Sequence, residues 1–242
     1  MLIAYDYYFQ PQILGRSRNQ NGRSYARILV RLAIAEYSSE FVPGPMEGGT
    51  FSPDNFDFRV YKIQDGDTPA SNPDYANWPV DQGAPVDENG DPLVTGDQMT
   101  WSVFNDANPD GHINDAADTQ PLGLEIQQTT FGYARGGALG NTYIIKYKII
   151  NKGGNNLEDT YVSIWVDPDL GSASDDLVGC DTLLSLGYCY NEGLTNRYGA
   201  APPAVGFDFF PGPIVPAEPK RFCSGEWKLA TRIQKSADEF IQ

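Results

Sequence analysis

Two stretches of alternating side chains, joined by a short turn-forming segment, are the feature that most limits how this chain can fold. In Tyr143–Asn151, aromatic and aliphatic residues occupy every second position. In Leu157–Asp167, Val162, Ile164 and Val166 alternate in the same way. This period of two is typical of β-strands. The intervening residues, NKGGNN, tolerate left-handed conformations, so the sequence predicts an antiparallel hairpin.

Other short segments of the chain also have strand patterns. Strands are predicted at Phe56–Ile63 and Met99–Asn105, and another begins at Leu124. In that last strand the alternation changes phase, which predicts a β-bulge near Gln127–Thr130. The chain contains 25 Gly and 18 Pro, which separate the strands by turns rather than by long helices. The sequence therefore predicts a mainly β protein, an antiparallel β-sandwich with long loops.

Short helices are expected only towards the ends of the chain. Ser24–Tyr37 fits a short helix with Ser24 as N-cap, but the same residues also alternate as a strand, so both alternatives stay open. In the final segment, Leu229, Ile233, Ala237 and Ile241 recur every four residues. That spacing predicts an amphipathic helix.

Charge divides the chain into three segments. Residues 1–36 contain five Arg and two acids, residues 37–216 are strongly acidic, and residues 217–242 are slightly basic. We interpret the middle segment as a β-sandwich module and the others as a distinct N-terminal segment and a short tail. The net charge of −15 argues against nucleic acid as a partner. No segment has the roughly 20 apolar residues of a membrane span, and the start does not resemble a signal peptide.

Three clusters of acidic residues and asparagines are candidate calcium sites. Hard cations prefer several oxygen ligands, and alternate acidic positions in a loop direct several oxygens inward. The alternative is that these side chains only stabilise their own turns, as Asx-turns do. We rank the cluster after the predicted hairpin first, because dense carboxylates there repel one another without a cation. The clusters are Asp167, Asp169, Asp175 and Asp176; Asp106, Asn108 and Asp110; and Asp87, Asn89 and Asp91.

Cysteine and histidine content limits the chemistry. The spacing of Cys180 and Cys189 favours a loop-closing disulfide, and buried thiols are the alternative. His112 is the only histidine, which excludes zinc sites built on several histidines. No nucleophile elbow, phosphate-binding loop or dinucleotide fingerprint is present. Paired carboxylates of the glycosidase type remain an alternative, but nothing singles out a pair. We therefore expect a protein that is not an enzyme.

Aromatic residues in the loops are candidate glycan ligands. Tyr75, Trp78, Tyr188 and Tyr190 lie in segments where flat rings can stack on sugars. A sandwich core and its rim use the same residue types, so burial is the alternative.

Long segments of the chain resemble the amino-terminal region of large, secreted bacterial surface proteins, many of which end in a type IX secretion sorting domain. The resemblance covers about residues 37–216. It implies an extracellular or cell-surface protein, where disulfides and millimolar calcium are available. The chain departs from it by lacking a signal peptide and a sorting domain, and Asn191–Arg197 is poor in acids where relatives have more aspartates. The matching segments are FRVYKI, DYANWPVDQGAPVDENGDPL, GDQMTWSVFNDANP, PLGLEIQQTTFGYARGGALGNTYIIKYKIINKGGNNLEDTYVSIWVDPDLG, DDLVGCDTLLSLGYCYN and YGAAPPAVGFDFFPGPIVP.

The sequence thus predicts a structural or adhesive module of a larger surface protein, with calcium-stabilised loops and other modules of that protein as partners. A carbohydrate-binding module is the alternative, and a glycoside hydrolase is less favoured.

Overall fold

The computed structural model describes most of the acidic segment and parts of both ends. It is a mainly β structure in which all paired strands are antiparallel, as the sequence predicts. The described residues are 8–19, 22–29, 41–46, 56–107, 121–154, 157–168, 170–172, 174–191, 197–208, 221–224 and 228–233.

The best-packed sheet is built on β5 (Gln98–Asn105), β6 (Leu124–Gly132) and β7 (Tyr143–Asn151). β3 (Val42–Pro43) and β4 (Tyr61–Gln64) pair with different parts of β5. The register of β6 is continuous against both neighbours. The predicted bulge at Gln127–Thr130 is therefore wrong.

A second sheet has β8 (Leu157–Asp167) at its centre, with β1 (Tyr8–Asn19) and β2 (Gly22–Leu29) on one side. On the other side are β13 (Lys228–Ile233) and β12 (Arg221–Ser224). Strands from both ends of the chain thus pair with β8, a strand of the acidic segment. The helix predicted at the C-terminal end is wrong where it overlaps β13, and the strand alternative holds for Ser24 to Leu29.

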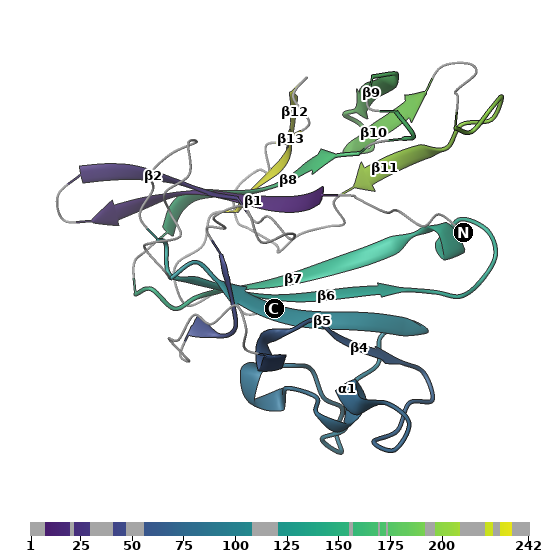
Figure 1. Cartoon of the computed structure of the whole chain (residues 1–242). Coiled ribbons are helices and arrows are strands. Elements are labelled where there is room, and N and C mark those ends of the chain that lie inside the picture. The colour runs from purple at the N-terminus through teal and green to yellow at the C-terminus, as the bar shows by residue number, and fades with distance from the viewer. Residues whose placement is uncertain are drawn as a thin grey trace.

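A third, smaller sheet consists of β9 (Asp176–Asp181), β10 (Leu186–Asn191) and β11 (Ala204–Asp208), with β10 in the middle. Figure 1 shows it beyond the end of β8, while the sheets of β8 and of β5–β7 form two layers, the arrangement of a sandwich. Leu157, the first residue of β8, packs with Phe104 of β5 and with Leu124 and Ile126 of β6. β8 therefore joins the apolar core of the β5–β7 sheet at its first residue.

The hairpin predicted between Tyr143–Asn151 and Leu157–Asp167 is wrong, although both strands have the expected bounds. β7 pairs with β6, and β8 pairs with β1 and β13. The Lys152 amide still donates to the Gly123 carbonyl, at 2.8 Å. Gly123 and Gly153 then bring the two backbones into close contact, with no room for a side chain. The connection leaves the sheet there and carries the chain to the other layer.

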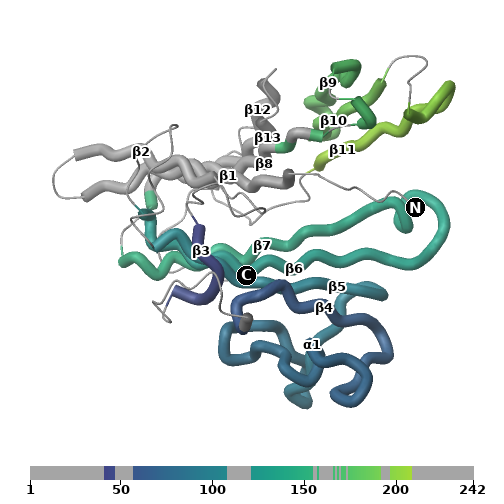
Figure 2. Tube along the Cα trace, in the orientation of Figure 1, coloured from purple at the N-terminus to yellow at the C-terminus, as the bar shows by residue number. Residues whose placement is uncertain are grey.

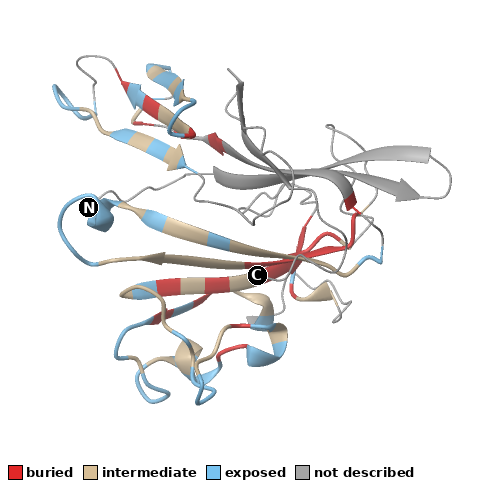
Figure 3. Cartoon of the chain, turned by 180° about the vertical axis from the view of Figure 1, so that it is seen from behind, coloured by how far each residue is buried: buried red, intermediate tan, exposed pale blue. Residues whose placement is uncertain are grey.

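The opposite face of β5 has its own core. Met99, Trp101 and Val103 are buried beneath residues 56–97, which Figure 2 shows folded to one side of β5. This segment contains α1 (Pro73–Ala76) and short 3-10 helices at Phe56–Phe58 and Val80–Gln82. The predicted strand Phe56–Ile63 therefore begins as a 3-10 helix. Because β5 and the first half of β6 are covered on both faces, buried residues concentrate there (Figure 3).

Candidate functional site

The carboxylate of Asp87 is used within its own loop. It accepts hydrogen bonds from the amides of Asn89 and Asp91, at 2.8 and 3.0 Å. The Asn89 amide is the main reason why the pKa of the Asp87 carboxyl lies below its ordinary value. Asn89 and Asp91 are exposed at the tip of the loop. These contacts are those of an Asx-turn, the alternative to a cation that the sequence leaves open.

Asp106 is completely buried, directly after β5. Its two carboxylate oxygens accept from the amides of Leu122 and Leu124, at 2.7 and 2.5 Å. It therefore holds the start of β6 against the end of β5. Asn108 and Asp110, predicted to act with it, lie outside the described residues.

The third cluster is brought together differently from the prediction. Asp175 and Asp176 lie next to Asn191, whose side-chain amide donates to both carboxylates, at 3.2 and 2.8 Å. The second oxygen of Asp176 accepts from the amide of Leu170, at 3.1 Å. Asp169 and the side chain of Asp167 lie outside the described part of the chain.

Sequence reasoning does not identify Asn191 as a partner, because its place opposite Asp176 depends on the register of β9 and β10. Within the described ranges, no group of three or more His, Cys, Asp or Glu side chains is placed to hold a metal ion.

Trp78, one of the candidate glycan ligands, belongs to the core. It is buried, its indole N–H donates to the Pro85 carbonyl at 2.9 Å, and its ring packs edge-on against Tyr61. Tyr75 packs half-buried against the same apolar cluster. The burial alternative therefore describes Trp78, which has no flat face available to a sugar.

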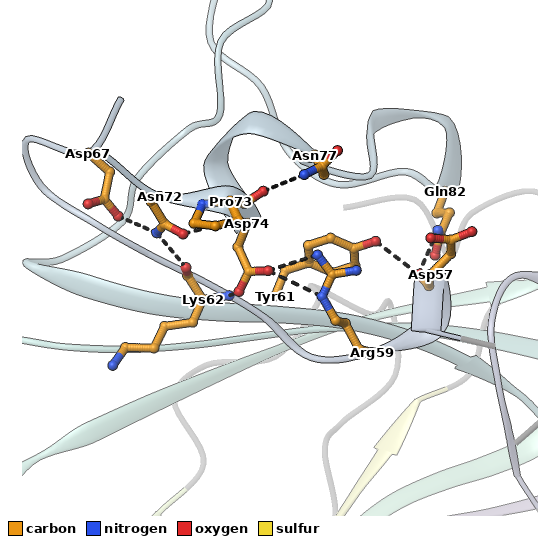
Figure 4. A network of polar contacts seen from close by, with 10 residues as sticks. All are labelled: Asp57, Arg59, Tyr61, Lys62, Asp67, Asn72, Pro73, Asp74, Asn77 and Gln82. Atoms are coloured by element: carbon orange, nitrogen blue, oxygen red, sulfur yellow. Dashed lines mark hydrogen bonds and ion pairs between the residues drawn. The ribbon is translucent and has the colours of Figure 1, made fainter. Parts of the chain in front are cut away.

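A polar network fixes the segment that contains these rings (Figure 4). Arg59 donates from Nε and Nη2 to one carboxylate oxygen of Asp74, at 3.2 and 2.8 Å, and lies over the ring of Tyr61. The other oxygen of Asp74 accepts from the Lys62 amide, at 2.9 Å. The side chain of Asn72 caps α1 and donates back to the Lys62 carbonyl. These contacts connect α1 to β4 and account for the local structure without a ligand.

Tyr188 and Tyr190 have a different environment. They lie on one face of β10, with ring centroids 6.0 Å apart and planes tilted by 41°. The ring of Tyr188 lies across Gly179 of β9, where a methyl group would collide with it. Gly206 and Ala204 of β11 lie opposite Tyr188 and Tyr190 on the other side. Tyr188 thus has a glycine on each neighbouring strand and is half-buried, whereas Tyr190 lies between Ala204 and Leu177 and is 38% exposed.

Other apolar side chains on this small sheet were not singled out from the sequence. Leu183 and Leu184 form the turn between β9 and β10, and Leu183 is 93% exposed. Asp181 accepts from both of their amides, at 2.9 and 3.0 Å, so the turn has a fixed shape. On the face of the tyrosine pair, Leu177 lies opposite Tyr190 and is also exposed.

The predicted disulfide between Cys180 and Cys189 is wrong. Cys189 is a buried thiol. In the register of β9 and β10, Cys180 lies opposite Gly187 and Cys189 lies opposite Val178. The two cysteines are thus diagonal neighbours, a relation that typically separates residues by about 7–8 Å, whereas a disulfide needs Cα atoms about 4.4–6.8 Å apart.

The buried carboxylate of Glu125 was also not predicted from the sequence. Glu125 of β6 accepts from Lys152 Nζ at 2.7 Å, from the Met46 amide at 2.9 Å and from Gln127 Nε2 at 3.2 Å. The change of phase in this strand arises because Glu125 and Gln127 are buried on its second face. Satisfied by these three donors, Glu125 has a structural role.

No family model, curated protein or solved structure matches this chain. None of the helices in the described ranges has the length and apolar character needed to cross a membrane.

Proposed function

We propose that this chain is a non-catalytic adhesion module of an extracellular surface protein, and that it binds glycans through the β9–β11 sheet. The observation that carries the proposal is the pair Tyr188 and Tyr190 on one face of β10, in which Tyr188 is half-buried and Tyr190 exposed. Of the four aromatic candidates, Tyr190 is the exposed one, since Trp78 is buried and Tyr75 and Tyr188 are half-buried.

The geometry of the pair suits a sugar ring. Flat aromatic faces bind the apolar C–H faces of pyranose rings, and a rigid backbone reduces the entropy lost on binding. Both tyrosines belong to the central strand of the sheet, hydrogen-bonded on both sides. The two rings are inclined to each other, so a chain of sugars would contact them in succession.

The surroundings of the pair add to this surface. Leu177 extends the apolar area on the same face, and the exposed Leu183 and Leu184 lie at the end of the hairpin. Contiguous exposed apolar groups on a soluble protein typically mark an interaction site. The acidic character of the chain favours a neutral or amino sugar over a negatively charged polysaccharide, because like charges repel.

The test is binding to a glycan array and to insoluble polysaccharides, with the wild type compared with Tyr190→Ala. Loss of one stacking ring is expected to cost about 1–2 kcal/mol, a roughly five- to thirtyfold weaker affinity. Tyr190→Phe should retain binding, because it keeps the ring. Tyr143→Ala is the matched control, since Tyr143 is 74% exposed but lies on β7 in another sheet. Equal binding by Tyr190→Ala and the wild type would refute the proposed surface.

A further inference from the structure

The strand β7 has a neighbouring strand on one side only. It ends the strand order of its sheet, so among the described residues its second edge pairs with no strand (Figure 1). With nine residues it is longer than a typical strand. The edge of a sheet presents a row of unpaired N–H and C=O groups that can pair with another extended segment. β7 is therefore a place where a further strand can be added.

The register of β7 against β6 shows which backbone groups face outward. In an antiparallel pair, residues that exchange hydrogen bonds alternate with residues that do not. The Lys152 amide donates to the Gly123 carbonyl at 2.8 Å and continues the register of β7 against β6. Every second residue of β7, counted back from Lys152, therefore bonds to β6. The alternate residues direct their N–H and C=O groups out of the sheet, and in the middle of the strand these are Ile145, Tyr147 and Ile149. Within the described ranges, no hydrogen bond reaches these outward groups.

The side chains beside this edge are of two kinds. Tyr147 and Ile149 lie on one face of β7 and pack against the core shared by β5 and β6. On the other face, Lys146 is exposed and Lys148 is half-buried. Neither lysine forms an ion pair or a hydrogen bond in the part of the chain that the structure describes. The edge thus offers apolar side chains on one face and two positive charges on the other.

We propose that the free edge of β7 binds an extended peptide segment in which acidic and apolar residues alternate. Hydrogen bonds to the backbone of Ile145, Tyr147 and Ile149 provide affinity, and the side chains of the added strand provide selectivity. Acidic side chains on the face of Lys146 and Lys148 form opposite-charge pairs across the two strands. Apolar side chains on the other face extend the core beside Tyr147 and Ile149.

The same charges argue against a second copy of this chain as the occupant. A twofold antiparallel pairing of β7 with itself, centred on Tyr147 or on either lysine, places a lysine of one copy opposite a lysine of the other. Like charges directly opposite each other are destabilising. An acidic segment has no such conflict, and the two lysines attract it locally although the chain as a whole carries a charge of −15. The inference does not depend on the proposed glycan surface, because β10 belongs to another sheet.

The first experiment measures binding of the full chain to a fluorescent peptide of about nine residues that alternates valine with glutamate, by anisotropy at low ionic strength. A peptide with lysine in place of glutamate should bind at least about tenfold more weakly. Lys146→Glu should weaken binding of the acidic peptide about fivefold or more, because an opposite-charge pair becomes a like-charge pair. Lys62→Glu, the same change at an exposed residue of β4, should bind as the wild type does. Absent binding, or equal affinities of the two variants, would overturn the proposal.

A second measurement separates strand addition from general attraction between opposite charges. Amide hydrogen exchange, followed by NMR, should slow at Ile145, Tyr147 and Ile149 when the acidic peptide binds, because their N–H groups gain partners. The amides of Lys146 and Lys148 already bond to β6 and should change less. Equal protection along β7, or none, would overturn pairing through this edge. Protection of the same amides at high protein concentration without peptide would identify a second copy as the occupant and refute the acidic segment. No glycan enters either experiment, so their failure would leave the glycan surface standing.

Discussion

Replacing Asp106 by Asn tests whether its carboxylate has a structural role or is a metal ligand. Asp106 is fully buried, and its two oxygens accept from the amides of Leu122 and Leu124. Asparagine has almost the same shape, but it presents an NH₂ group where one of these amides needs an acceptor. One backbone N–H then loses its partner, and the other faces a neutral oxygen instead of a charged one.

The expected loss of stability follows from these two contacts. Hydrogen bonds to a charged group contribute about 1.5–3 kcal/mol each, and an unsatisfied buried donor costs about 1–3 kcal/mol. Relief from burying a charge offsets part of this loss. We expect Asp106→Asn to lower the free energy of unfolding by about 2–4 kcal/mol. With a urea m-value of about 3 kcal/mol/M, the urea concentration at the midpoint of unfolding falls by about 1 M.

The assay is urea unfolding of the variant and the wild type, each in calcium and in chelator. Asp91→Asn is the control, because Asp91 is an exposed carboxylate in a loop and should change stability by less than about 0.5 kcal/mol. The effect of Asp106→Asn should be the same in both buffers. If chelator lowered the wild type to the level of the variant, Asp106 would be a metal ligand, and the structural explanation would be refuted.

Three further changes test other parts of the fold. The hydroxyl of Tyr147 is buried without a partner, and burial raises its pKa. Above a pH of about 10, the unfolded chain therefore loses this proton while the folded protein keeps it. The resulting loss of stability with rising pH, about 1.4 kcal/mol per pH unit, should be absent in Tyr147→Phe, measured by urea unfolding from pH 9 to 11; an unchanged slope would contradict this. Gly123→Ala should cost at least about 2 kcal/mol, because φ is +78° and the methyl group meets the facing loop, whereas Gly136→Ala meets nothing; equal melting temperatures would contradict this. Asp74→Asn should cost about 1 kcal/mol through the ion pair with Arg59, and the difference in thermal unfolding should shrink in 1 M salt; a larger difference in salt would exclude the ion pair as the cause.

Local periodicity predicted where several strands lie, but not how they pair. The segments predicted at Tyr143–Asn151 and Leu157–Asp167 are β7 and β8. Alternation is a property of a single strand, whereas pairing depends on the whole chain. The partners of β8 come from Tyr8–Asn19 and Lys228–Ile233, segments that are distant in sequence. A turn-rich connection such as NKGGNN is equally suited to joining two strands in one sheet and to crossing between layers.

The candidate site shows the same limit at the level of single residues. Trp78 and Tyr190 look alike as aromatics between turn formers, but one is buried under residues 56–97 and the other lies on an open face. Which of these environments an aromatic side chain meets depends on the strand that lies beside it. Asn191 illustrates the point, because its role depends on being opposite Asp176 in the register of β9 and β10.

This acidic chain accommodates the negative charge of its described loops mainly through local hydrogen bonds. In the described loops, aspartates accept mainly from backbone amides: Asp97 from Ala134, Asp181 from Leu183 and Leu184, and Asp106 from Leu122 and Leu124. Such carboxylates stabilise their own loops by charge-assisted hydrogen bonds and need no metal. Asp175 and Asp176 differ, because the donor between them is a side-chain amide that leaves its own oxygen without a partner. Neighbouring amides, from the backbone or from a side chain, therefore supply the partners of these carboxylates in the described part of the chain.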